Sequence, residues 1–332
     1  MHTFEFERAT DSAAAVATAA QAKTAQQGAD VRFVAGGTTL LDLMKLNVET
    51  PARVIDINRL PLDKIEATPD GGLKIGATVR NSDLANHPTV KRDYAVLSQA
   101  ILSGASAQLR NMATTAGNLV QRTRCVYFRD TAMPCNKREP GTGCPAITGA
   151  NRMLAILGTS EHCIATNPSD MCVAMAALEA TIHVQGPKGV RAIAIGNFHL
   201  LPGTTPHRET VLEPGDLITH VTLPPPVAGS KQVYLKLRDR ASYEFALASA
   251  AVVITVAAGK VTRARIALGG VGTKPWRSPE AEAALVGEAV NQTSFRNAAE
   301  AALRDAKPQS ENGFKIELAK RCLTHVLQMA TA

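Results

Sequence analysis

The chain has 332 residues, 45% of them hydrophobic and 20% charged, which is typical of a soluble globular protein with room for two or three domains. Only 4% of the residues are aromatic, so the base-stacking surface of a single-strand nucleic-acid binder is not expected. The net charge of +7 suits nucleic acid, an anionic cofactor or an acidic partner subunit, and it does not choose among them.

The N-terminal stretch MHTFEFERATDSAAAVATAA lacks the basic segment and apolar segment of an export signal. No apolar run approaches the roughly 20 residues of a membrane-spanning helix. We therefore expect no membrane insertion and no export of this chain by its own signal. A reducing compartment would make metal binding a more common use of clustered cysteines than disulfide formation.

The first part of the chain alternates between strand and helix patterns. Strands are predicted at 3–8, 32–37 and 53–57, and helices between Thr10 and Gly28 and at 38–46. Thr10, Asp11 or Ser12 is expected to cap the first helix. This order predicts a small parallel α/β subdomain.

The rest of the chain follows a different pattern, with hairpins and longer helices. Hairpins are predicted at 64–77 and 180–195, and a strand at 216–226. Helices are predicted at 88–105 and 169–180, together with a short helix that is capped by Asn81 or Ser82. A domain boundary is placed after the three prolines that end at Pro226. Strands and two helical stretches, at 278–290 and 314–330, follow this boundary. The predicted fold class is α+β with mixed sheets.

Two glycine-containing turns are candidates for ligand binding. FVAGGTTLL (33–41) and LRNMATTAGNL (109–119) combine small residues, threonines and glycines, although neither G-x-G-x-x-G nor a P-loop is present. Their backbone N–H groups and hydroxyls suit a pyrophosphate. They also suit tight turns in which glycine takes a positive φ and threonine caps a helix. The residues alone leave both interpretations open.

Four cysteines lie in an irregular stretch broken by prolines and glycines. Cys125, Cys135, Cys144 and Cys163 have the spacing C-x9-C-x8-C-x18-C, without the close pairs that structural zinc sites prefer. Four thiolates would satisfy an iron–sulfur cluster. Free thiols and disulfides remain alternatives. Cys172 and Cys322 lie in apolar helical stretches and are expected to be core residues.

A basic stretch runs through the same part of the chain. It contains Arg110, Arg122, Arg124, Arg129, Lys137 and Arg138. Compensation of anionic cofactors, a docking surface for a partner and a solvated loop are all open interpretations, while nucleic-acid binding lacks interleaved aromatic residues. No catalytic triad or carboxylate pair is indicated, so no catalytic residue is assigned. The pattern is that of a cofactor carrier.

Several motifs together resemble a known family. FVAGGTTLLDLMK, QLRNMATTAGNL, NPSDM and LKLRDRASYEFALASAA resemble the FAD-binding subunit of the xanthine oxidase family of molybdenum hydroxylases. Within that family the chain looks most similar to the FAD subunits of bacterial periplasmic aldehyde oxidoreductases. The resemblance covers essentially the whole chain, including IALGGVGTKPWR and the C-terminal helices.

The resemblance implies a domain organisation. An FAD-binding domain of the vanillyl-alcohol-oxidase (PCMH) type would span residues 1–226, with subdomains at 1–58 and 59–226. A C-terminal α+β domain like that of the CO dehydrogenase flavoprotein would span residues 227–332.

The resemblance also implies which residues bind FAD. The first turn would line the pyrophosphate through Val34, Ala35, Gly36, Gly37, Thr38, Thr39 and Leu40. The second clamp would consist of Thr114, Thr115, Gly117 and Asn118. Asp170 would contact the sugar or adenine side, and Ile218 and Lys236 would lie near the flavin.

An insertion distinguishes this chain from most of the family. In most members TAGNL runs almost directly into the segment that matches NPSDM, whereas here residues 122–165 intervene and hold all four clustered cysteines. A minority of the family carries a [4Fe–4S] cluster in such an insertion. The resemblance therefore implies that Cys125, Cys135, Cys144 and Cys163 ligate a [4Fe–4S] cluster.

The implied function is electron transfer within a complex. A large subunit with a molybdenum–pterin cofactor would oxidise an aldehyde to the acid, and a small subunit with [2Fe–2S] clusters would pass electrons to FAD on this chain and on to an external acceptor. The chain would reach the periplasm by co-export with a partner that bears a signal, with the cytoplasm as the alternative. A self-sufficient flavin oxidase and a metal-dependent nucleic-acid-binding module are rival hypotheses.

Overall fold

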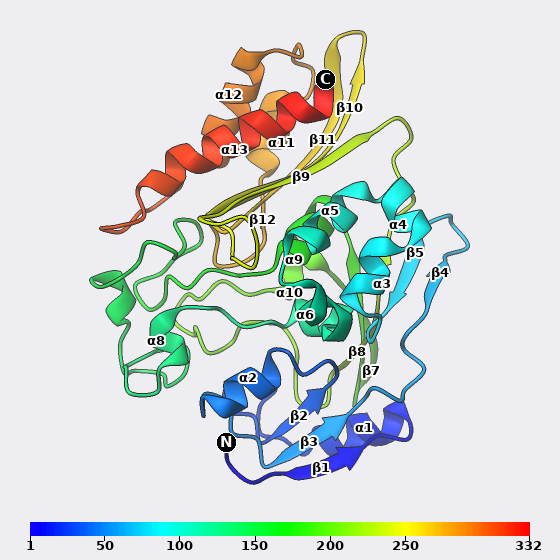
Figure 1. Ribbon diagram of the computed structural model, residues 1–332, viewed down its shortest axis with the longest axis vertical. Coiled ribbons are helices and arrows are strands. Elements are labelled where there is room, and N and C mark those ends of the chain that lie inside the picture. Colours follow the sequence, from blue (N-terminus) through cyan, green and yellow to red (C-terminus); the bar gives the residue numbers. More distant parts are fainter.

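The computed structural model describes all residues from Met1 to Ala332 (Figure 1). Three sheets follow one another from the N-terminal end of the molecule to its C-terminal end, with three, five and four strands in chain order. No helix is both long and apolar enough to cross a membrane.

The first sheet is the predicted parallel α/β subdomain. Its strands are β1 (Glu5–Arg8), β2 (Val31–Val34) and β3 (Arg53–Asp56), and β3 pairs in parallel with both others. Helix α1 (Ser12–Ala19) begins at Asp11, whose side chain accepts from the N–H of Ala14. The helix ends well before Gly28, so the predicted length was wrong. Beyond it, the Gln26 amide donates to the carbonyls of Thr210 and Leu212 at 3.1 and 2.8 Å, which holds this stretch against a distant loop.

The second sheet confirms both predicted hairpins. It consists of β4 (Ile65–Ala67), β5 (Leu73–Gly76), β6 (Thr181–Gly186), β7 (Gly189–Ala194) and β8 (Leu217–Leu223). The order is β4-β5-β8-β6-β7, and every pair is antiparallel. Helix α9 (Asp170–Ala177) is buried along its whole length, because it packs against α5 (Ala95–Ser103) and also against the third sheet.

The predicted helix at 88–105 is two helices. α4 (Pro88–Asp93) and α5 meet at Tyr94, whose buried ring hydroxyl donates to the Pro224 carbonyl at 2.8 Å. This long-range contact turns the chain where local propensity favours one helix. The preceding helix, α3 (Asn81–Asn86), has no side-chain cap, so the predicted cap at its start was also wrong.

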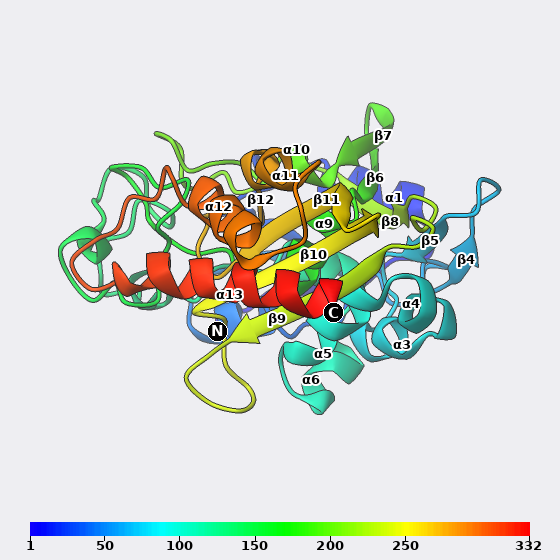
Figure 2. The same ribbon diagram turned by 90° about the horizontal axis from the view of Figure 1, so that it is seen from above.

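The C-terminal sheet is covered by helices on one face (Figure 2). Its strands are β9 (Lys231–Leu237), β10 (Ala248–Ala257), β11 (Lys260–Gly269) and β12 (Trp276–Arg277), and the helices are α11 (Pro279–Leu285), α12 (Gln292–Ala302) and α13 (Phe314–Thr331). Helix α12 was not predicted, although Asn291 caps it by accepting from the N–H groups of Thr293 and Ser294. Strands β8 and β9 belong to different sheets. The exact domain boundaries stay predictions.

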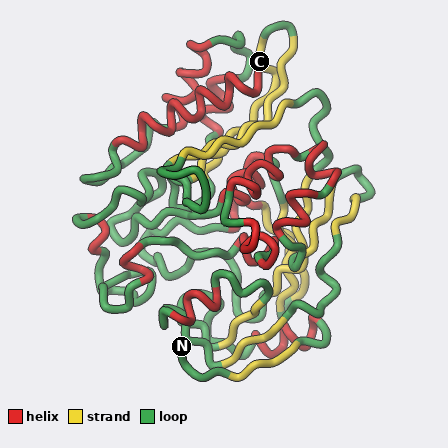
Figure 3. Tube along the Cα trace, in the orientation of Figure 1, coloured by secondary structure: helices red, strands yellow, loops and turns green.

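The cysteine-rich insertion is mostly loop (Figure 3). Its regular elements are the short helix α8 (Val126–Arg129) and the 3₁₀ turn η1 (Pro145–Ile147). The irregular backbone predicted from the prolines and glycines is confirmed.

Three short helices lie outside the insertion. They are α6 (Ala107–Met112), α7 (Thr115–Leu119) and α10 (Ile195–Phe198).

Candidate functional site

The first glycine turn connects β2 to the short helix α2 (Leu40–Lys45) and lies directly against the second turn. A Cβ on Gly36 would lie 2.0 Å from the carbonyl oxygen of Met112, so only glycine permits this approach. Gly37 has a φ of +72°, which also favours glycine. The two motifs, far apart in the sequence, therefore form one structure.

The second turn is the start of α7. The hydroxyl of Thr114 accepts from the N–H of Gly117 at 3.3 Å, which makes Thr114 the helix cap. Thr115 is buried, and its hydroxyl donates to the Val79 carbonyl at 3.2 Å. The Asn118 side-chain oxygen accepts from the hydroxyl of Ser169 at 2.7 Å. The capping role predicted for threonine in this turn is thus confirmed.

A cavity of about 250 Å³ opens between these turns and the loop at 199–216; we call it the glycine-turn cavity. Every predicted residue from Val34 to Leu40 lines it, together with Thr114 and Gly117. Thr115 and Asn118 do not line it. The backbone N–H groups from Gly36 to Leu40 donate no hydrogen bond to another backbone group of the chain. They form a set of free donors of the kind that binds phosphate oxygens.

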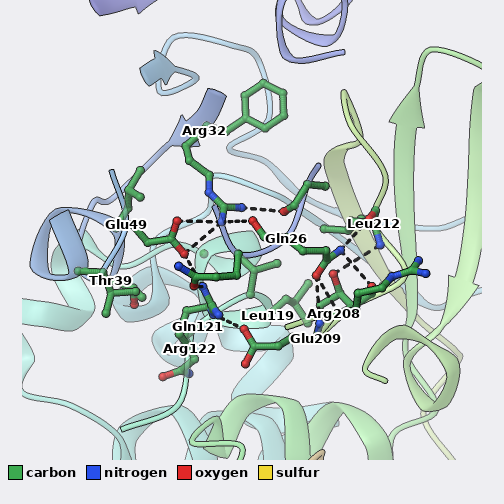
Figure 4. Close-up of a pocket in the computed structure, with 18 of the residues that line it drawn as sticks. Gln26, Arg32, Thr39, Glu49, Leu119, Gln121, Arg122, Arg208, Glu209 and Leu212 are labelled. Carbon is green, nitrogen blue, oxygen red and sulfur yellow. Dashed lines mark hydrogen bonds and ion pairs between the residues drawn. The ribbon is translucent and has the colours of Figure 1, made fainter. Parts of the chain in front are cut away.

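A chain of buried charges forms one wall of the glycine-turn cavity (Figure 4). The Glu49 side chain is only 2% exposed and pairs with Arg32 at 2.9 Å and with Arg122. Arg122 also pairs with Glu209. Burial raises the pKa of Glu209, but the charges of Arg122 and Lys137 outweigh it and leave this pKa below its usual value. Nη2 of Arg122 has no hydrogen-bond partner in the chain.

A histidine completes this wall. Nε2 of His199 lies 2.9 Å from the Leu119 carbonyl and donates to it, whereas Nδ1 has no partner. Burial lowers the pKa of His199 to about 4, so the ring is neutral at pH 7. Sequence reasoning missed His199, Arg32, Glu49 and Glu209, because their role comes from contacts between residues distant in the chain.

The remaining predicted FAD ligands do not line this cavity. Lys236 and Asp170 pair with each other at 2.8 Å, and Asp170 also accepts from the hydroxyl of Tyr234. Ile218 is buried in the core of the second sheet. The assignment of these three residues to FAD stays a prediction, since the structure gives each of them a place within the protein interior.

The four clustered cysteines line a second, small cavity of about 10 Å³, which we call the cysteine cavity. Cys125, Cys135 and Cys163 are buried in one hydrophobic cluster, and Cys144 packs against it. None forms a disulfide. No group of three or more His, Cys, Asp or Glu side chains is arranged to hold a single metal ion.

Backbone N–H groups point toward the sulfurs. Burial raises the pKa of Cys125 to about 12, and the backbone groups of Phe128 and Tyr127 oppose this rise. Burial also raises the pKa of Cys144, against the backbone groups of Ile164 and Ala146. The N–H of Ala165 donates to the Cys163 sulfur at 3.5 Å.

Asn136 orders the loop between the second and third cysteines. Its side-chain oxygen accepts from the N–H groups of Gly141 and Gly143 at 3.1 and 2.8 Å. Its amide donates to the carbonyl of His162 at 3.1 Å, beside Cys163. Sequence reasoning missed this buried asparagine, although its position directly after Cys135 was a signal.

The basic stretch is used mainly within the chain. Arg129 makes two bonds to Asp42 at 2.8 and 3.1 Å, and Arg110 donates to the Gly104 carbonyl at 2.6 Å. Arg138 donates to the carbonyls of Tyr127 and Phe128. These bonds show that the basic side chains order the loops, which argues against a freely solvated loop.

Comparison with known proteins identifies the class. Residues 3–226 match the family described as the FAD binding domain in molybdopterin dehydrogenase, and residues 233–330 match the CO dehydrogenase flavoprotein C-terminal domain. The chain belongs to this family of FAD-binding subunits of molybdenum hydroxylases, as its motifs predicted. The predicted α+β fold class is confirmed.

Three individual proteins show how similar the chain is to members of this family. The chain is 54% identical over 335 residues to the aldehyde oxidoreductase FAD-binding subunit PaoB of Escherichia coli (strain K12), covering 100% of this chain and 99% of that protein. It is 28% identical to the glyceraldehyde dehydrogenase medium chain of Sulfolobus acidocaldarius, over 85% of this chain and 83% of that one. A solved structure of carbon monoxide dehydrogenase from Hydrogenophaga pseudoflava, lacking the Mo-pyranopterin moiety, superposes with a TM-score of 0.77 at 27% identity, covering 99% and 98% of the two chains.

Proposed function

We propose that this chain is the FAD-binding electron-transfer subunit of a heterotrimeric molybdenum aldehyde oxidoreductase. The observation that carries the proposal is the 54% identity to an aldehyde oxidoreductase FAD-binding subunit over the whole chain, together with the glycine-turn cavity. The large subunit would hold the molybdenum–pterin cofactor and the aldehyde, and the small subunit would hold [2Fe–2S] clusters. The rival hypothesis of a self-sufficient flavin oxidase has no support from the relatives.

The glycine-turn cavity fits the anionic part of FAD. The free N–H groups of the first turn and the hydroxyls of Thr38 and Thr39 supply donors where a pyrophosphate needs them. The Nη2 group of Arg122, which has no partner in the chain, adds a buried N–H donor on the charged wall. When bound, FAD accepts electrons one at a time and delivers them in pairs, which is the chemistry of the cofactor itself.

The cysteine cavity supports the finer proposal of a [4Fe–4S] cluster held by Cys125, Cys135, Cys144 and Cys163. Four thiols from distant points of one insertion meet around a single small cavity, and backbone N–H groups face their sulfurs. Both features suit a thiolate-bound cluster. The names of the three relatives do not mention such a cluster, so the support for this proposal comes from the four cysteines.

The chain's own groups would hold and insulate the cofactors. The glycine turns would position the pyrophosphate through backbone donors, and Asp170, Ile218 and Lys236 are proposed to border FAD beyond the glycine-turn cavity. The hydrogen bond of His199 and the ion pairs of Glu49 would keep the wall of the cavity ordered. No residue of the chain is proposed to act on the aldehyde.

The partners and location follow from the same relationship. We propose that the final acceptor is external to the complex and that the complex reaches the periplasm through a signal on a partner subunit. Cell fractionation of the co-produced complex, before and after deletion of the partner's signal, tests the location. Retention of activity in the cytoplasmic fraction with the intact signal contradicts it.

The first experiment is a visible absorption spectrum with FAD and iron determinations on the complex and on this subunit isolated anaerobically. We expect the isolated subunit to contain one FAD and four iron atoms per chain and to show no aldehyde oxidation. In the complex, these four iron atoms should be present in addition to those of the [2Fe–2S] clusters. Flavin without iron would overturn the cluster and keep the FAD subunit. Aldehyde turnover by the isolated chain would overturn the electron-transfer assignment.

A further inference from the structure

The two cavities share one wall. Lys137, Cys163 and Ala165 line both the glycine-turn cavity and the cysteine cavity. Lys137 is the only lysine or arginine among the residues that line the cysteine cavity. Its side chain is only 9% exposed, so its charge acts where water screens it poorly.

The bonds of Lys137 hold its ammonium group in place. Nζ donates to the Pro206 carbonyl at 2.9 Å and pairs with a Glu209 carboxylate oxygen at 3.0 Å. An ammonium group has three donors, and no third acceptor is present in the chain. The backbone N–H of Glu209 is in turn bound to the Gln26 side chain at 3.0 Å. The position of the charge is therefore set by the segment 206–209, which Gln26 in turn holds in place.

Other cations of the insertion do not line the cysteine cavity. Arg138 and Arg122 contact Phe128, which does. Arg129 is paired with Asp42, and Arg138 donates to backbone carbonyls. Arg122 stacks over the ring of Phe128 and faces Glu49 and Glu209. Burial raises the pKa of the Cys163 thiol, the charge of Lys137 opposes this rise, and the charge of Glu209 adds to it, as expected for charges close to the sulfur.

We propose that Lys137 and Glu209 are positioning residues that set the reduction potential of the cluster in the cysteine cavity. This inference rests on the [4Fe–4S] cluster proposed above. Reduction of a thiolate-bound cluster adds one electron and therefore one negative charge. A nearby ammonium stabilises the reduced state and raises the potential, whereas a nearby carboxylate lowers it.

The test is a redox titration of the purified complex, followed by the EPR signal of the reduced [4Fe–4S] cluster. Lys137→Gln removes the positive charge and is expected to move the cluster potential to a more negative value. Glu209→Gln is expected to move it to a more positive value. The double variant should lie between the two. Lys188→Gln, at an exposed position in the β6–β7 hairpin, makes the same charge change away from the cavity and should leave the potential unchanged.

The outcomes separate this inference from the proposed function. Absence of the additional iron from the wild-type complex overturns the cluster itself. A wild-type cluster with the same potential in both single variants, or with shifts of equal sign, overturns the role of Lys137 and Glu209 alone. If Lys137→Gln does not retain a cluster, Glu209→Gln decides: a positive shift supports the inference and any other result overturns it.

Discussion

The glycine-turn cavity and the cysteine cavity adjoin each other but are built from different parts of the chain. Backbone groups and glycines form the turns of the first, where the side chains mainly need to be small, and a chain of buried charges forms one of its walls. Four specific side chains form the second, carried by loops with few regular elements. Backbone donors do not depend on side-chain identity except at the glycines of the turn, whereas a site made of four thiols depends on each one. The expected effects of mutation follow this difference.

The largest effect is expected from removing one thiol. Cys135→Ser should abolish the cluster, because a [4Fe–4S] cluster normally has four protein ligands. We expect loss of the additional iron while FAD remains bound, as measured by iron and flavin determinations on the purified complex. Cys322→Ser is the matched control, since Cys322 is buried in α13 away from the cavity. Loss of FAD together with iron would show that the two cavities are not independent.

Breaking the buried ion chain tests the polar wall of the glycine-turn cavity. Glu49→Gln leaves Arg32 and Arg122 without their shared carboxylate and should lower the free energy of unfolding by about 3–5 kcal/mol. Asp239→Asn breaks a surface pair with Arg152, in which both side chains are about half exposed, and should lower the free energy of unfolding far less. Denaturant unfolding of the full chain measures both. Equal effects would mean that burial does not strengthen the Glu49 pairs.

Acid is expected to weaken the glycine-turn wall through His199. Its pKa of about 4 in the folded chain lies below the ordinary value of 6.5, so the unfolded chain binds the proton more readily. Stability from this group is complete above pH 6.5 and is lost as the pH falls to 4, by about 3 kcal/mol. The difference in unfolding free energy between wild type and His199→Gln should change by that amount over this range. A constant difference would contradict a buried neutral histidine.

The smallest effect is expected from a single added methyl group. Gly36→Ala would place a Cβ against the Met112 carbonyl and should shift the two turns apart at a cost of about 1–3 kcal/mol. We expect this cost to reduce the free energy of FAD binding, so that FAD affinity drops by about tenfold or more, as measured by flavin titration of the cofactor-free complex. Gly196→Ala has no atom within 4 Å of the added Cβ and serves as the control. Unchanged affinity would separate the turn contact from FAD binding.

Local patterns in the sequence identified much of the architecture. Alternating strands and turn residues predicted the parallel subdomain and both hairpins, because these depend on neighbouring residues. Helix ends were harder to predict. The break at Tyr94 depends on a hydrogen bond to Pro224, and the early end of α1 accompanies bonds from Gln26 to residues beyond 200. No local signal contains such contacts.

The sequence by itself determined the two candidate motifs, the four cysteines in an irregular insertion and the family to which the chain belongs. Only the tertiary structure decided that Gly36 meets Met112, that Lys236 pairs with Asp170, and that Lys137 lies between the two cavities beside Glu209. The physical reason is that composition and spacing fix the chemical groups available to a site. Packing between distant segments fixes which of those groups face each other, and with it their charge and burial.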